Sequence, residues 1–206
     1  EIPKHWKVTK LKNISKVTLG KMLTNDDKGG MVLQKYLRSA NVQEDNLDLN
    51  DVNEMWFSHA ELDKLNLKSG DILVNEGGQV GRPCFIDEDV KDLYFQNSIN
   101  RIRTKKTVPY FLYLFVLSTF RRGYYDSIVD RVSIPHLTKE KLENTIVIIP
   151  SLSEQNQICD VISSRSNTFE ILLFNEVKKA ELLREFRQSL ISSVVTGKVR
   201  VTEDMI

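Results

Sequence analysis

The sequence predicts a mixed α/β globular domain over residues 1–150, followed by one long α-helix that extends from it. Short runs of alternating apolar and polar residues, separated by turns rich in Gly, Asn and Asp, indicate the strands of the domain. From Ser151 to Thr196 the chain contains no proline and no glycine. Apolar residues in that stretch recur at steps of three and four, which is helical spacing. A chain of 206 residues allows one domain and such an extension.

Local sequence signals place the elements of the domain. Ser58 and Glu61 have capping-box spacing, and Pro109 suits the first turn of a helix. Gly70-Asp71 marks a turn before an apolar run. In chain order we expect a mixed strand and short-helix segment at 6–19, a loop at 20–30, a bent strand at 31–42, a turn and edge strand at 44–53, a helix at 58–67, strands at 72–74 and 83–86, an alternating segment at 93–103, an aromatic helix at 110–125, a polar loop at 126–136, a helix at 137–142 and a strand at 145–149.

The long helix has sequence signals at both ends. Ser151 and Glu154 form a capping box, and Gly197 suits the position just beyond a helix C-terminus. A helix of about 44 residues is roughly 66 Å long at 1.5 Å per residue. Nothing else in the chain can cover an apolar stripe of that length, so we expect the helix at 151–197 to pair with a partner helix. After it we expect a tail at 198–206 that begins with a short strand at 198–202. The stripe consists of Ile158, Ile162, Phe169, Leu172, Leu173, Val177, Ala180, Leu183, Phe186, Leu190 and Val194.

The distribution of charge is more informative than the net charge of +1. The net charge is +5 over residues 1–25, −8 over 26–96, +5 over 97–136 and −1 over 137–206. If the two basic blocks converge in space, they make a patch suited to phosphates. The alternative is that each block is a solvated face.

Composition excludes several classes of protein. No apolar run reaches the ~18 residues that cross a membrane, and the charged start is unlike a signal peptide. Cys84 and Cys159 have no Cys or His nearby at ligand spacing, so we expect both to be buried small hydrophobic residues rather than zinc ligands or a disulfide. These features fit a cytoplasmic protein.

Three polar loops, at 20–30, 75–82 and 126–136, carry residues suited to binding nucleic acid. Arg, Lys, Asn and Gln can pair with base edges in the major groove, and lysines and exposed glycine amides suit phosphates. For each arginine taken alone, the alternative is a surface ion pair. The candidate DNA-contacting residues are Lys21, Arg38, Asn41, Gln79, Arg82, Arg131, Ser133 and His136.

The sequence does not match the motifs of the common catalytic sites. The glycines at 77–81 lack the spacing of a nucleotide-binding P-loop. Asp71 and Glu76 flank a short strand, as carboxylates do in metal nucleases, but no lysine follows two residues after Glu76. A Ser133–His136 pair suits a loop hydrogen bond or a DNA contact better than a catalytic triad. With no S-adenosylmethionine or base-methylation motif, we expect no catalytic site, no metal and no cofactor on this chain.

Several strings resemble the specificity subunits of type I restriction-modification enzymes, and together they span essentially the whole chain. One departure is Ser151, where that family often has a second proline, but serine also caps helices well. The strings are Ile2-Pro3-Lys4-His5-Trp6, Tyr36-Leu37-Arg38-Ser39-Ala40-Asn41-Val42-Gln43, Gly70-Asp71-Ile72-Leu73, Gly81-Arg82, Ile149-Pro150-Ser151-Leu152-Ser153-Glu154-Gln155, and Ser189-Leu190-Ile191 with Val194-Val195-Thr196-Gly197-Lys198.

The resemblance implies a target recognition domain at 1–150 that reads double-stranded DNA, and a spacer helix that docks a modification (methyltransferase) subunit. S-adenosylmethionine is then expected on that partner, and nuclease activity on a restriction subunit. The usual specificity subunit has two such domains and two helices. This chain is therefore either a half-subunit that forms a homodimer or one half of a longer protein. An antiparallel coiled coil of two copies would place two domains roughly 60 Å apart or less, to read a palindromic split site.

Two other classes remain open on the residues alone. The first is a non-DNA interaction scaffold, a globular head on a coiled-coil arm, in which the basic blocks are incidental. Because DNA binding through several phosphates weakens steeply with salt, salt dependence separates this class from a DNA reader. The second is a self-contained nuclease or methyltransferase, which the missing motifs disfavour.

Overall fold

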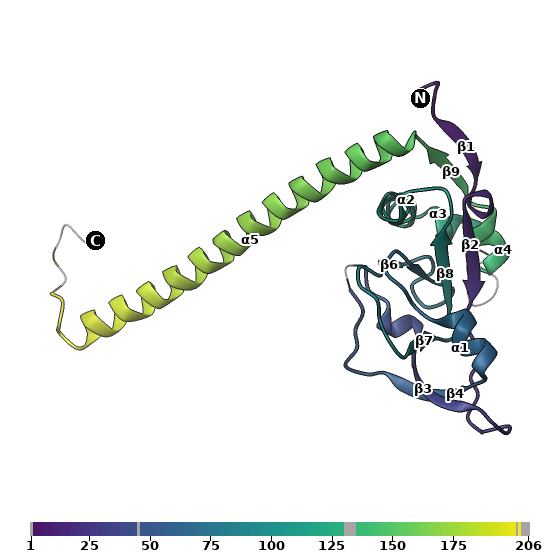
Figure 1. Ribbon diagram of the computed structural model, residues 1–206. Coiled ribbons are helices and arrows are strands. Elements are labelled where there is room, and N and C mark those ends of the chain that lie inside the picture. Colours follow the sequence, from purple (N-terminus) through teal and green to yellow (C-terminus); the bar gives the residue numbers. More distant parts are fainter. Residues whose placement is uncertain (1, 45, 130–134, 201, 203–206) are drawn as a thin grey trace. The chain divides into compact units, whose positions relative to one another are not determined.

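The computed structural model describes residues 2–44, 46–129, 135–200 and 202 (Figure 1). It divides into two compact units, residues 1–159 and 160–206, and each is described by itself. The division falls inside the long helix rather than at Pro150, because Gln155 and Cys159 of its first turns are buried in the first unit.

The centre of the first unit is a four-stranded antiparallel sheet of order β2-β8-β5-β6. The pairing of β2 with β8 joins the two basic blocks of the sequence, with Lys16 opposite Arg103. All residues of β5 are buried, which explains its continuous apolar run. The strands are β2 (Ser15–Leu19), β5 (Ile72–Asn75), β6 (Pro83–Phe85) and β8 (Ile99–Thr104).

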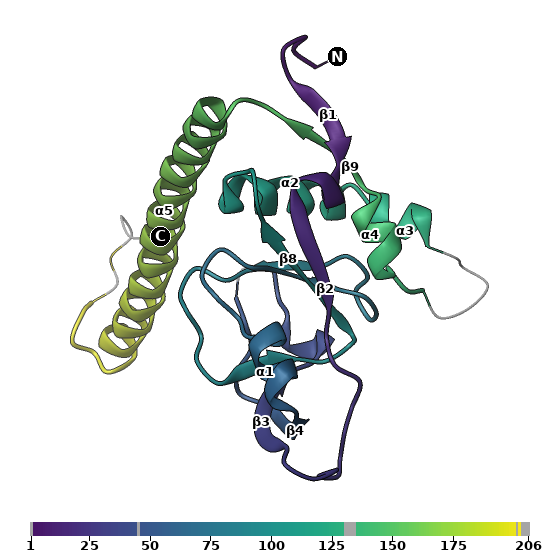
Figure 2. The ribbon, with the colours of Figure 1, turned by 45° about the vertical axis from the view of Figure 1, so that its right-hand side comes forward.

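Two smaller sheets complete the strands. In one, β3 pairs antiparallel with β4 and parallel with β7; in the other, β1 pairs antiparallel with β9. Figures 1 and 2 show the β1–β9 pair and the β3–β4 pair at opposite ends of the first unit. These strands are β1 (Lys7–Lys10), β3 (Val32–Leu37), β4 (Asn53–Phe57), β7 (Leu93–Phe95) and β9 (Ile146–Ile149).

The short helices follow their capping signals. The Ser58 side chain accepts from the Glu61 N–H and the Glu61 carboxylate accepts from the Ser58 N–H, so the predicted capping box is confirmed. The predicted aromatic helix is broken, because Gly123 adopts a left-handed φ of 70°. The helices are α1 (His59–Leu65), α2 (Pro109–Arg121), α3 (Tyr124–Ile128) and α4 (Lys139–Glu143).

Two apolar clusters form the core of the first unit, one on each side of β5. Ile72 and Val74 belong to the cluster beneath α2, and Leu73 belongs to the cluster with β3, β4 and β7. This alternation follows from the period of a strand, which sends successive side chains to opposite faces. Cys84 and Cys159 are both buried, as the sequence predicted.

Asp71 of the Gly-Asp turn is the centre of a buried ionic network. Its carboxylate accepts two hydrogen bonds from the Arg103 guanidinium, Nε to Oδ1 and Nη2 to Oδ2, both at 2.6 Å. Arg101 lies with its Nε 4.0 Å from Oδ2 and donates to the carbonyls of Asn66 and Lys64. Burial lowers the pKa of Arg101 to about 10, against the opposing effect of Asp71, so it stays charged at neutral pH.

The long helix α5 runs continuously over Leu152–Val195, 44 residues. Its predicted start is confirmed: Ser151 N–H donates to the Glu154 carboxylate at 3.0 Å, and Glu154 N–H donates to Ser151 Oγ at 3.3 Å. Its predicted end is also confirmed, because Gly197 adopts a φ of 72° and donates to the Val194 carbonyl.

Besides the aromatic helix, three further segments differ from the prediction. The edge strand expected at 44–53 begins only at Asn53 and runs to Phe57, because residues 48–51 form a polar turn around Asn41. The alternating segment at 93–103 is two strands, β7 and β8, in different sheets. No strand forms in the described part of 198–202; instead the Lys198 and Val199 N–H groups both donate to the Ser193 carbonyl at the end of the helix.

Candidate nucleic-acid interface

Four loops of the first unit are joined by hydrogen bonds to Ser98 or Glu76, and we call them the loop cluster: residues 38–43, 75–82, 96–98 and 135–137. Ser98 Oγ accepts from the Ser39 N–H at 3.2 Å, and its carbonyl accepts from the Glu76 N–H at 2.8 Å. The Asn75 amide donates to the Ser39 carbonyl, and Leu137 N–H donates to the Glu76 carbonyl. These bonds fix loops from distant parts of the sequence against one another.

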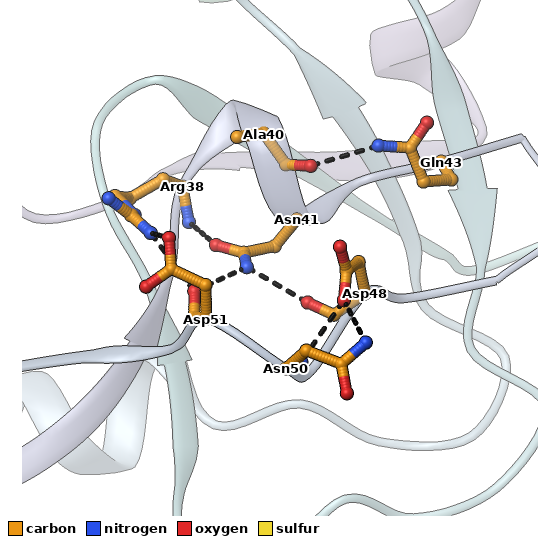
Figure 3. Close-up of polar contacts among 7 residues, drawn as sticks. All are labelled: Arg38, Ala40, Asn41, Gln43, Asp48, Asn50 and Asp51. Carbon is orange, nitrogen blue, oxygen red and sulfur yellow. Dashed lines mark hydrogen bonds and ion pairs between the residues drawn. The ribbon is translucent and has the colours of Figure 1, made fainter.

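The first loop is braced by Asn41, which is buried (Figure 3). Its Oδ1 accepts from the Arg38 N–H at 2.8 Å, and its Nδ2 donates to the carbonyls of Asp48 and Asp51, both at 2.9 Å. Arg38 Nη2 pairs with the Asp51 carboxylate at 2.6 Å. Both donors of the Asn41 amide therefore already have backbone partners, which gives this residue a structural role in the loop.

The glycine-rich loop packs closely on its neighbours. Gly78 has a φ of 74°, and a Cβ added there would lie 3.6 Å from Ser39 Oγ. A Cβ on Gly77 would lie 3.5 Å from the His136 imidazole. Both distances are ordinary van der Waals contacts, so glycine is required here by the left-handed φ of Gly78 rather than by lack of space, and Gln79 is exposed at the tip.

Glu76 lies at the inner end of this loop, next to His136. Burial raises the pKa of the Glu76 carboxyl, while His136 and a hydrogen bond from Asn100 oppose the rise. His136 is itself exposed. Within the loop cluster, Glu76 is therefore an acceptor close to an exposed imidazole.

Arg82 lies at the other end of the glycine-rich loop, against residues 42–46. Its Nη1 donates to Gln43 Oε1 at 2.6 Å. The two side chains line a small polar depression with Glu44 and Asn46. Arg82 thus connects the loop cluster to an open polar surface.

Lys21 is not part of the loop cluster's exposed surface. Its Nζ lies 2.6 Å from Glu61 Oε1 and over the Phe57 ring, and its side chain is 10% exposed. Burial raises the pKa of the Glu61 carboxyl, but hydrogen bonds from Lys21 and Ser58 outweigh that effect and lower it overall. This partly buried ion pair ties the residue after Gly20 to helix α1.

The structure thus brings Arg38, Gln79, Arg82 and His136 to the loop cluster and uses Lys21 and Asn41 to hold loops in place. Arg131 and Ser133 lie outside the described residues. As DNA contacts, all eight remain predictions. Sequence reasoning missed Ser39 and Ser98, because a single serine in a loop gives no signal that its hydroxyl or backbone joins two loops.

The second basic block contributes less free charge than its composition indicates. Arg101 and Arg103 turn toward Asp71, and Arg121 Nη2 pairs with Glu44 at 2.8 Å. Three arginines of this block therefore pair with carboxylates of the protein. For these three, the alternative of an ion pair within the protein is confirmed over a free charge.

The apolar stripe of α5 is uncovered over most of its length. Phe169 is 65% exposed, and Leu172, Leu183 and Phe186 are similarly exposed. A second set of exposed apolar residues, Ile171, Phe174 and Leu182, lies on another face, because Phe174 is about 140° around the helix from Phe169 at 100° per residue. The helix has two apolar faces.

Within the described ranges, no group of three or more His, Cys, Asp or Glu side chains is placed to hold a metal ion. In the same part of the chain, no helix is long and apolar enough to span a membrane.

The chain thus combines a domain whose polar loops are joined by hydrogen bonds with a long helix that carries exposed apolar side chains. The family model of the type I restriction modification DNA specificity domain matches residues 3–182, and the chain belongs to this family.

Comparison with individual proteins gives the same family. The chain is 25% identical to the type I restriction enzyme MjaVIII specificity subunit of Methanocaldococcus jannaschii, over 98% of this chain and 48% of that protein. In fold it resembles a chain from a structure of a type I R-M system (TM-score 0.67, 14% identity, 94% of this chain and 46% of that one). It also resembles the HsdS subunit of Thermoanaerobacter tengcongensis (TM-score 0.62, 12% identity, 94% and 45%). The chain spans about half the length of these proteins.

Proposed function

We propose that this chain is a DNA sequence recognition module of a type I restriction-modification complex, without catalytic activity of its own. The observation that carries the proposal is the family match over residues 3–182. The loop cluster supports it, because DNA readers need polar side chains held on a rigid scaffold. Methylation and cleavage then belong to partner subunits, with S-adenosylmethionine on the modification subunit.

The loop cluster is the proposed reading surface. Gln79 can pair with both the N6 and N7 of adenine, and Arg82 or Arg38 with the O6 and N7 of guanine, through the bidentate geometry that their side chains allow. His136, with Arg131 and Ser133 from the same polar loop, extends the surface. In this proposal, binding to DNA replaces the contact of Arg38 with Asp51 and the contact of Arg82 with Gln43.

The stripe of α5 is proposed to pair with the same stripe of a second copy or of a second half-subunit, in an antiparallel coiled coil. Leaving a row of exposed large apolar side chains in water is unfavourable, and a helix with the same stripe covers it along its whole length. Two copies related by a twofold axis would carry two reading surfaces roughly 60 Å apart or less.

The second apolar face of α5, Ile171, Phe174 and Leu182, is proposed as the contact for the modification subunit. A helix paired on one face still exposes these three side chains, which are 56–68% exposed. The restriction subunit would join the assembly through that complex.

Salt dependence of DNA binding tests the proposal. We expect the full chain to bind a fluorescent duplex with an affinity that falls steeply with salt. Arg82→Ala should weaken binding about tenfold or more. The control is Lys68→Ala, an exposed lysine at the other end of β5 from the glycine-rich loop. Binding that is absent at low salt would contradict a DNA reader and favour the interaction scaffold.

A further inference from the structure

Glu76 is the only carboxylate in the loop cluster, whose residues are all within the described ranges. The side chains of Arg38, Gln79 and Arg82 in the same loops offer hydrogen-bond donors. A carboxylate repels the phosphates of DNA, so it is unfavourable on a DNA-reading surface unless a specific donor binds it. We therefore expect Glu76 to have a donor partner in the complex with DNA.

The Glu76 carboxylate is anchored at one oxygen and open at the other. Its Oε2 accepts from Asn100 Nδ2 at 3.4 Å. Among the described residues no hydrogen bond reaches Oε1, and this atom is not one of the buried oxygens that lack a partner. Because the side chain is only partly buried, Oε1 faces solvent and is available to an incoming donor.

Asn100 ties this carboxylate to the central sheet. It is fully buried on β8, and its Nδ2 also donates to the Leu137 carbonyl at 3.3 Å. Strand β8 is paired on both edges, with β2 and with β5, so its backbone is held firmly. A reading group that is fixed before binding loses little conformational entropy in the complex.

The surroundings of Glu76 leave the open oxygen accessible but poorly solvated. Gly77 and Gly78 follow it directly and have no side chains that could cover it. Burial raises the pKa of the Glu76 carboxyl and outweighs the opposing effects of His136 and Asn100. A donor on the DNA would therefore replace solvation that the free site lacks.

The chemistry of the bases selects cytosine as that donor. In the major groove cytosine presents only its N4 amino group, whereas adenine presents its N6 amino group beside the N7 acceptor, which repels a carboxylate. Guanine offers two acceptors and thymine one acceptor and a methyl group. We propose that Glu76 accepts a hydrogen bond from N4 of one cytosine in the target and determines the base at that position. This inference rests on the proposed function, because it names one base contact of the same reading surface.

Selection from a random duplex library with the full chain tests the role of Glu76. The unaltered chain should enrich a motif that contains the cytosine. With Glu76→Gln the ratio of cytosine to adenine at that position should fall about tenfold, because an amide adds the donor that adenine N7 accepts. The matched control is Glu44→Gln, which removes the same charge from a carboxylate that borders the Arg82 depression and pairs with Arg121. It should leave every base preference unchanged.

A modified duplex tests the same contact without changing the protein. With N4-methylcytosine at the selected position, a methyl group replaces the N4 hydrogen that faces the major groove, so the unaltered chain should bind about tenfold more weakly. The control duplex carries N4-methylcytosine outside the motif. This measurement also decides the case in which Glu76→Gln fails to fold.

The outcomes separate this inference from the proposed function. Failure of the unaltered chain to enrich any sequence would overturn both. A motif that Glu76→Gln leaves unchanged, or one that Glu44→Gln alters at the same position, would overturn the role of Glu76 alone. Undiminished binding of the duplex with N4-methylcytosine in the motif would do the same.

Discussion

At the scale of single residues, the Gly-Asp turn illustrates how one carboxylate organises a domain. The sequence indicated a turn at Asp71 and disfavoured a nuclease site there, because no lysine follows two residues after Glu76. The structure explains the aspartate: it is 1% exposed and accepts two hydrogen bonds from Arg103 beside the buried Arg101. Spacing along the chain could not predict these partners, because β8 lies next to β5 only after the sheet has formed.

Removing the charge of Asp71 should be strongly destabilising. Asp71→Asn keeps the shape of the side chain but leaves Arg101 buried without an opposite charge, so we expect a loss of about 3–5 kcal/mol in the free energy of unfolding. Urea denaturation measures it. Asp87→Asn, an exposed carboxylate nearby, should change stability by less than ~0.5 kcal/mol. A similar small change at Asp71 would show that the network is not needed for folding.

Glu154 offers a prediction about pH. A hydrogen bond from His5, together with those from Ser151, lowers the pKa of its carboxyl from 4.5 to about 2. A carboxylate with a lowered pKa stabilises the folded state above pH 4.5, and this stabilisation is lost as the pH falls toward 2. NMR titration should show the pKa of Glu154 rising toward 4.5 in His5→Ala. An unchanged pKa in that variant would mean that the contact is absent in solution.

At the scale of elements, short sequence motifs correctly predicted the helix ends that depend only on neighbouring residues. The capping boxes at Ser58 and Ser151 and the glycine at 197 were predicted correctly, because each involves only a few neighbouring residues. The helix at 110–125 was predicted as continuous, although Gly123 breaks it. The strand at 44–53 was misplaced because the Asn41 side chain donates hydrogen bonds to the carbonyls of Asp48 and Asp51. A hydrogen bond from a side chain to a distant loop leaves no trace in the alternation of apolar and polar residues.

Gly81 should be the least replaceable glycine of its loop. It has a φ of 80°, and an added Cβ would overlap the buried Tyr125 ring. Gly81→Ala should therefore destabilise the chain by about 2–4 kcal/mol, from backbone strain and overpacking together. Gly123→Ala is the matched control, because Gly123 has a φ of 70° but nothing within 4 Å of its Cβ position. It should cost only about 1 kcal/mol. Thermal unfolding compares the two, and equal losses would contradict the packing argument.

At the scale of the whole molecule, the helix was the most predictable part and the reading surface the least. An apolar period near 3.5 residues needs no tertiary information, so the length and ends of α5 followed from the sequence. The loop cluster depends on hydrogen bonds among the backbone groups of Ser39, Glu76, Ser98 and Leu137 and the Ser98 hydroxyl, and these four residues share no sequence motif. Loops that carry specificity have to differ between relatives, so a family resemblance identifies their position but not their contacts.

Two phenylalanines on α5 test the proposed pairing with a second copy and the face that it uses. Phe169 and Phe174 are 65% and 68% exposed, so they differ mainly in the face they occupy. If the proposed dimer forms, Phe169→Asp should convert it to a monomer, because the substitution places a charge in the proposed seam. Phe174→Asp should leave the dimer intact. Light scattering over a concentration series distinguishes 23.8 kDa from about twice that mass. Dissociation of the Phe174 variant alone would assign the pairing to the other face.

The central claim, that the loop cluster reads DNA sequence, is tested most directly by selection from a random duplex library with the full chain. The account predicts enrichment of a split motif whose two halves are related by a twofold axis. In a variant carrying Gln79→Ala and Arg82→Ala, specific positions of that motif should lose their base preference. Failure of the unaltered chain to enrich any sequence would contradict the claim, and an identical motif from the double variant would place the reading surface elsewhere on the domain.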